Sequence, residues 1–178
     1  MRLIYIFIFA VLHSGTFAQT FIPDDASSKV SFKIKNFGTT VDGSFNGLKG
    51  TILFDASKLS DTKFDVTINA VTIDTGIGMR DNHLRKADYF GVTDFPLIRF
   101  VSTKVIASAK PNEAIITGKL TIKKTTKEIS FPFSYSLSNV GLQFKGEFQL
   151  NRRDFNVGGN SLSLSDELTV LLDVKSSK

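Results

Sequence analysis

The sequence predicts an all-β protein whose antiparallel strands close into a barrel, with one short helix near the barrel end. Three observations carry this prediction. Apolar and polar residues alternate along most of the chain, short turns containing Gly, Asn and Lys separate the alternating segments, and the alternation stops in one stretch, residues 79–90. One-sided alternation is typical of antiparallel strands with one wet face. Periodicity alone does not separate a two-sheet sandwich from a barrel, and we favour the barrel because closure removes exposed strand edges.

About eight strands are expected from the alternating segments. In residues 29–35, for example, Val30, Phe32 and Ile34 share one face while the residues between them are polar. The other predicted apolar faces comprise Phe45; Phe64, Val66 and Ile68; Ile98 and Phe100; Ile116, Leu120 and Ile122; Ile129, Phe131, Phe133, Tyr135 and Leu137; Leu142, Phe144, Phe148 and Leu150; and Leu168, Val170, Leu172 and Val174. In a barrel with room inside, these side chains become the lining of a pocket.

The stretch 79–90 has helical rather than strand spacing. One stripe holds Met79, His83, Ala87 and Phe90, with Leu84 at its border, while Asp81, Arg85 and Asp88 point away. Glycines precede the stretch, and Gly91 and Pro96 follow it, so it is punctuated at both ends. We therefore expect a short amphipathic helix that lies over the barrel end as a plug.

Residues 1–18 have the layout of a secretory signal peptide. Arg2 precedes a ten-residue apolar run, and small residues lead to a cleavage site between Ala18 and Gln19. Ten apolar residues fall well short of the ~20 that span a bilayer, and the chain lacks the cysteine of a lipoprotein. We expect one domain, residues 19–178, that is soluble and periplasmic or secreted.

The composition excludes several function classes. The net charge of +5 comes from basic residues scattered among acidic ones, which argues against a nucleic-acid partner. There is no cysteine and therefore no disulfide, so packing must hold the fold. Three of the 17 phenylalanines lie in residues 1–18, which leaves 14 for the domain. The chain contains no tryptophan.

The residues that catalysis or metal binding would need are mostly missing. Outside residues 1–18, His83 is the only histidine, and neither a nucleophile elbow nor a phosphate-binding glycine loop occurs. We expect no metal, no cofactor and no enzymatic activity. A secreted hydrolase that uses Asp81, Asp88 or His83 remains a weaker alternative, since the two carboxylates suit a solvated helix face better than a catalytic pair.

Two interpretations of His83 stay open. It packs at the end of the sheet, hydrogen-bonded to a loop carbonyl or to Asp81, or it contacts a ligand head group together with Arg80. The pair Arg152–Arg153 is expected to be solvated, with a contact to a ligand as the alternative.

Several segments, in this order, resemble the YceI-like family of lipocalin-like, polyisoprenoid-binding proteins. They are SKVSFKIKNFG (28–38), VDGSFNGLKGTILFD (41–55), IDTG (73–76), RDNHLRKADYF (80–90), FPLIRFVS (95–102), GKLTIKKTTKEISFP (118–132) and LNRRDFNV (150–157). The resemblance spans nearly the whole predicted domain. Asn156 stands where the family has glycine, and asparagine is the residue that best replaces glycine in a left-handed conformation.

The resemblance implies an extended lipocalin-like barrel around an apolar tunnel, with the helical segment at its end. It also implies non-covalent binding of a long amphiphile such as a polyisoprenoid, an isoprenoid quinone, a fatty acid or a fatty amide. The residues expected to contact this ligand are Phe32, Ile34, Phe45, Val66, Ile68, Arg80, His83, Leu84, Phe90, Phe100, Leu120, Phe131, Phe133, Phe144 and Phe148. The rival is a structural or stress-response interaction protein whose barrel is filled by its own phenylalanines. Transient membrane contact and a homodimer stay open.

Overall fold

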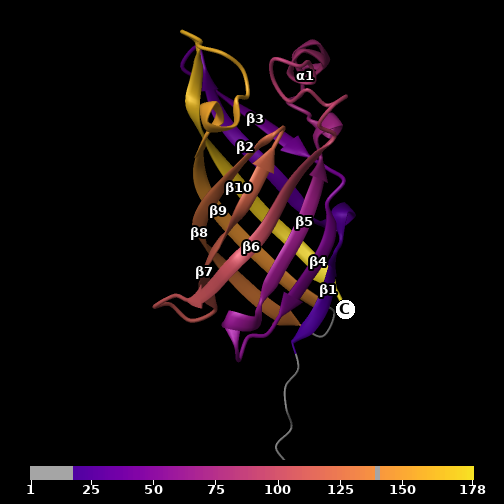
Figure 1. Cartoon of the computed structure of the whole chain (residues 1–178), viewed down its shortest axis with the longest axis vertical. Helices are drawn as coiled ribbons and strands as arrows, with labels where there is room; N and C mark the ends of the chain where they lie inside the picture. Colours follow the sequence, from indigo (N-terminus) through magenta and orange to yellow (C-terminus); the bar gives the residue numbers. More distant parts are fainter. Residues whose placement is uncertain (1–17, 139–140) are drawn as a thin grey trace, which may run out of the picture.

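The computed structural model describes residues 18–138 and 141–178, and these form an antiparallel β-barrel with one helix (Figure 1). The expected signal peptide falls almost wholly on residues 1–17, which lie outside the described residues. Its cleavage and the domain boundary at residue 19 therefore stay predictions. No helix in the described ranges is long and apolar enough to span a membrane.

The described residues form ten strands, one α-helix and four short 3₁₀ turns. The strands are β1 (Gln19–Pro23), β2 (Lys29–Asn36), β3 (Thr39–Phe45), β4 (Lys49–Phe54), β5 (Lys63–Asn69), β6 (Leu97–Ala107), β7 (Glu113–Ile122), β8 (Thr125–Ser138), β9 (Gly141–Asn151) and β10 (Leu164–Ser177). The helix is α1 (Gly78–Leu84), and the turns are η1 (Asp25–Ser27), η2 (Leu59–Asp61), η3 (Ala70–Thr72) and η4 (Arg152–Phe155).

Eight of these strands close into a ring, in the order β1-β4-β5-β6-β7-β8-β9-β10. The ring closes where β10 pairs with β1 through Ile22↔Ser177 and Pro23↔Ser176. Further along β10 its partner is β2, which in turn pairs with β3. The predicted barrel of about eight strands is thus confirmed, and the hairpin β2–β3 continues its wall beyond the closed ring.

The predicted apolar faces point into the barrel, with one exception at a strand end. Leu137, the last apolar residue predicted on β8, is 58% exposed. A β-bulge in β6 between Ser102 and Lys104 resets the alternation, so Val105 enters the core and Lys104 stays outside. The bulge is fixed from β5, where the Phe64 backbone N–H donates to the Ser102 hydroxyl over 2.8 Å.

Glycines on the inner face make room for the many phenylalanine rings. A Cβ built on Gly43 would lie 2.2 Å from the ring of Phe32, and one on Gly118 would lie 2.5 Å from the ring of Phe100. Each ring thus lies directly over the backbone of a neighbouring strand. This close approach explains how one small barrel holds so many aromatic side chains.

Pro132 marks a place where the barrel wall divides. β8 pairs with β9 only from Phe133 to Ser138, whereas its earlier residues pair with β7 alone. Proline has no N–H for a second neighbour and belongs on a strand edge. The rings of Phe131 and Phe148 stack with centroids 4.2 Å apart, one from each side of this division.

The helical segment was predicted correctly in place but not in extent or orientation. α1 ends at Leu84, and the rest of the predicted helix 79–90 forms turns. Met79 is 85% exposed, and His83 and Ala87 are exposed as well, so the predicted packing stripe is wrong. The predicted spacing assumed a helix of more than three turns, and only two are present.

Polar side chains, rather than the apolar stripe, attach α1 to the barrel. Asp81, expected to face solvent, is buried and accepts hydrogen bonds from the Thr75 backbone N–H (2.9 Å) and hydroxyl. Arg85, also expected to point away, donates to the carbonyls of Val71 and Ile73. Leu84, Tyr89 and Phe90 supply the apolar contact with the core instead.

Candidate functional site: an apolar cavity

The barrel encloses an apolar cavity of about 270 Å³. Ligand pockets for small molecules begin at about this size. The walls come from β2–β10 and from the segment between η3 and β6 that contains α1. The lining is almost wholly hydrocarbon, so the cavity suits an apolar chain and offers water no partners.

The structure brings 14 of the 15 sequence-predicted contact residues to this lining. They are Phe32, Ile34, Phe45, Val66, Ile68, Arg80, Leu84, Phe90, Phe100, Leu120, Phe131, Phe133, Phe144 and Phe148. Their role in binding stays a prediction, but their common location is a finding.

His83 is the residue that the structure does not place there. Its side chain is exposed, and its ring lies edge-on to Tyr89 at a centroid distance of 4.9 Å. Asp81, its proposed partner, is already engaged by Thr75. His83 is therefore separated from the cavity by Tyr89, which itself lines the cavity.

Two kinds of lining residue were not among the expected ligand contacts. Val170 and Leu172 lie on an apolar face that the alternation did predict, although they were not named as contacts. Ile73, Tyr89 and Val157 come from irregular segments, for which strand periodicity says nothing.

The two ends of the barrel differ in how they are packed. At one end Phe21, Val105 and Leu142 are at most 2% exposed and fill the interior. At the other end, where β2 finishes and β10 begins, the lining residues Ile34 and Leu164 are only half buried. We infer that the cavity opens between this part of the wall and the segment that contains α1.

Arg80 is a cationic side chain at this mouth. Its Nε donates to the Thr75 hydroxyl and its Nη2 to the Thr75 carbonyl, both over 2.7 Å. The Nη1 group has no hydrogen-bond partner among the described residues. Arg80 is thus held in place by two bonds and keeps donors for a polar group at the opening.

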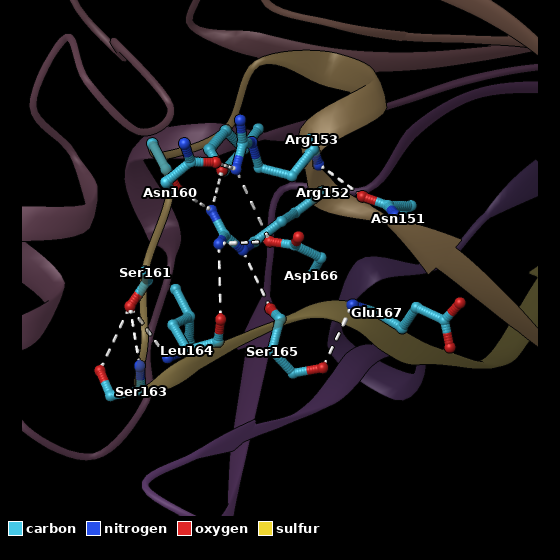
Figure 2. Close-up of polar contacts among 12 residues, drawn as sticks. Asn151, Arg152, Arg153, Asn160, Ser161, Ser163, Leu164, Ser165, Asp166 and Glu167 are labelled. Atoms are coloured by element: carbon cyan, nitrogen blue, oxygen red, sulfur yellow. Dashed lines mark hydrogen bonds and ion pairs between the residues drawn. The ribbon is translucent and has the colours of Figure 1, made fainter.

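Arg152 is not the solvated residue that the sequence suggested. It is 5% exposed, and its guanidinium donates to the carbonyls of Val157, Gly159, Leu164 and Ser165 and to the carboxylate of Asp166 at 2.6 Å (Figure 2). These bonds occupy the donors of the side chain. Arg152 therefore fixes the loop between η4 and β10 and is not available to a ligand.

Asn156, at the end of η4, adopts the left-handed conformation expected of it, with φ 55°. Its backbone N–H closes the turn on Arg153.

The ion pair between Arg99 and Asp65 lies away from the cavity. Hydrogen bonds from Arg99 lower the pKa of the Asp65 carboxyl, and both residues stand on the outer face of β5 and β6. Nor do the described residues contain a group of three or more histidine, cysteine or acidic side chains that could hold a metal ion.

Comparison with known proteins identifies this architecture. Residues 21–176 match the family model described as the YceI-like domain. The chain belongs to this family. Protein YceI of Salmonella arizonae is 31% identical over 155 residues, which cover 82% of this chain and 79% of that protein.

Solved structures of similar proteins share the fold. BcnA of Burkholderia cenocepacia is 27% identical, with a TM-score of 0.82 over 88% of this chain and 99% of BcnA. The YceI protein of Campylobacter jejuni is 26% identical, with a TM-score of 0.70 over 79% of this chain and 86% of that chain. A polyisoprenoid-binding domain from Saccharophagus degradans is only 14% identical, but it superposes with a TM-score of 0.71 over 91% of this chain and 99% of that domain.

Replacing Arg152 tests its structural role. Arg152→Ala leaves buried loop carbonyls without a donor and should lower the free energy of unfolding by on the order of 3 kcal/mol. Arg153→Ala, at the neighbouring and more exposed residue, should cost less than about 1 kcal/mol. Urea unfolding of both variants measures the difference, and equal midpoints would contradict the assignment.

Proposed function

We propose that this protein is an exported, non-catalytic binding protein that holds one long-chain amphiphilic lipid with its apolar tail inside the barrel. The observation that carries the proposal is the apolar cavity, whose exposed lining is almost wholly hydrocarbon and which lies next to a tightly packed barrel end. Ligands of this chemistry include polyisoprenoids, isoprenoid quinones, and fatty acids or amides. The fold shared with the polyisoprenoid-binding domain of Saccharophagus degradans supports this ligand class.

The tail supplies most of the affinity in this proposal. Burying one CH₂ group is worth roughly 0.8 kcal/mol, so about ten carbons contribute on the order of 8 kcal/mol before ordering costs. An exposed charged contact contributes only about 0–1 kcal/mol. The cavity should therefore accept several head groups on tails of similar length.

The absence of catalysis is supported by what surrounds the cavity. The surface that the lining exposes to the cavity is almost wholly hydrocarbon, and the carboxylate of Asp81 is engaged by Thr75. Asp88, the other carboxylate of the hydrolase alternative, is exposed. The rival in which phenylalanines fill the barrel fits the tightly packed region around Phe21 and Leu142, but it does not account for the cavity.

Export rests on the sequence of residues 1–18, with its short apolar run and its small residues before Gln19. A protein in the periplasm or outside the cell that lacks disulfides must be held together by packing alone. The two buried apolar clusters inside the barrel provide that packing.

Narrowing the cavity tests the proposal. Val170 lies on the inner face of β10 opposite Phe148 and Phe32, so Val170→Trp should displace at least two chain carbons. We expect about tenfold weaker binding of a fluorescent long-chain fatty probe. Thr169→Trp, one residue away on the outer face, is the matched control and should bind like the unchanged protein.

Circular dichroism checks that both variants are folded. If the fluorescent probe binds equally to both folded variants, the tail does not lie in the cavity and the proposal fails.

In the same proposal, Arg80 binds the polar head group of the lipid. Its unused donors at the mouth suit a phosphate or carboxylate, and a charged hydrogen bond at a half-buried residue is worth about 1 kcal/mol. Arg80→Met should therefore weaken a fatty acid probe about fivefold and leave a fatty alcohol probe of equal length nearly unchanged. Equal losses for both probes would show that Arg80 only holds the loop through Thr75.

A further inference from the structure

Several large apolar side chains, including Val71 and Leu97, stand exposed at the end of the barrel that carries α1, and the four most exposed of them lie on loops or at the start of α1. These four are Phe37 (84% exposed), Ile77 (53%), Met79 (85%) and Leu162, which is fully exposed. We call this set the rim. It comes from three separate segments: the β2–β3 turn, the start of α1, and the loop between η4 and β10. In Figure 1 these three segments project from the same end of the barrel.

The rim lies close to the cavity lining along the chain. Phe37 directly follows the lining residue Asn36, and Leu162 lies two residues before the lining residue Leu164. Ile77 and Met79 lie between Thr75 and Arg80, which also line the cavity. Each rim residue is thus within three positions in the chain of a residue that lines the cavity.

Backbone hydrogen bonds join the three segments into one frame. The Phe37 N–H donates to the Ser163 carbonyl over 2.8 Å, which ties the β2–β3 turn to the loop before β10. The Gly158 N–H donates to the Asp88 carbonyl over 2.8 Å, which ties that loop to the segment after α1. The rim side chains are therefore presented by anchored loops.

Phe37 has a strained backbone conformation, and its side chain adds little packing to the fold. It has φ 48° and Gly38 has φ 75°, so both central residues of this two-residue hairpin turn have positive φ. Such turns favour Asn-Gly, and a bulky residue with positive φ is strained. Packing of the Phe37 ring does not offset this strain, because the ring is exposed. A strained, exposed phenylalanine at a binding mouth indicates a contact outside the chain.

We propose that the rim docks the barrel onto a lipid bilayer, with its four side chains in the boundary between head groups and acyl chains and the cavity mouth facing the membrane. This inference rests on the proposed function, because a ligand with a long apolar tail resides in a membrane before the protein takes it up. Separate side chains on loop tips around an opening suit insertion into a fluid interface. Basic residues such as Lys35 and Lys86 are offset by acids such as Asp74 and Asp88, so docking depends mainly on apolar contact and only weakly on salt.

The lack of tryptophan in the chain allows a direct test. Phe37→Trp places a single indole on the rim, and Leu137→Trp places one at the opposite end, beside Leu142 and hence near the end of β10. With vesicles of phosphatidylcholine brominated on its acyl chains, the Phe37→Trp emission should shift to shorter wavelength and be quenched. The Leu137→Trp emission should do neither, and quenching of both or of neither would overturn the proposal.

A second variant separates docking from folding and from ligand binding. Phe37→Asn supplies the residue that the turn prefers, so its melting temperature should equal or exceed that of the unchanged protein. Its flotation with phosphatidylcholine vesicles should fall about fivefold, and its binding of a soluble fatty probe should not change. Undiminished flotation would contradict the role of Phe37.

The outcomes also distinguish failure of the docking proposal from failure of the proposed lipid-binding function. If the unchanged protein binds the fatty probe but does not float with vesicles, only the docking proposal fails. If it floats but binds no probe, the proposed function fails while the rim still contacts membranes. If light scattering shows a dimer that Phe37→Asn dissociates, the rim is an interface between copies of this chain and docking is wrong.

Discussion

The structure depends on closure of the sheet, which is completed by the short pairing between β1 and β10. Closure turns one face of every strand in the ring toward a single interior, so the apolar faces pack against one another rather than against a second sheet. In the absence of cysteine, burial of these faces is the main force that holds the domain together. The cavity follows from the same constraint, because the inward side chains pack tightly in part of the interior and only line the rest.

The irregular segments close the parts of the barrel that the strands do not cover. β8 pairs with β9 only after Pro132; before it, the rings of Phe131 and Phe148 stack, and η4 contacts β8. Arg152 then fixes the loop after η4, and Asp81 with Thr75 fixes the start of α1. The apolar interior therefore supplies the ligand chemistry, whereas buried polar side chains in the loops fix the position of the mouth.

The strands and most of the lining could be predicted from sequence because both follow one local rule. Alternation places Phe32, Phe100 and Phe144 on inner faces whatever the rest of the chain does. The orientation of α1 could not be predicted in the same way, since a two-turn helix is positioned by side-chain bonds to the loop before it. The prediction that Arg152 is solvated was wrong for a related reason. Its carbonyl partners lie up to 13 residues later in the chain, and no periodic pattern shows that they will surround it. His83 looked functional because histidine is rare in this chain, but rarity carries no information about where a side chain points.

The central claim is that one lipid tail occupies the barrel, and native mass spectrometry of protein purified without detergent tests it most directly. The account predicts a complex heavier than the polypeptide by the mass of one long-chain lipid, which organic solvent releases and which the Val170→Trp protein carries in smaller amount. A single peak at the polypeptide mass, unchanged after incubation with vesicles that contain polyisoprenoid and fatty amide, would contradict it.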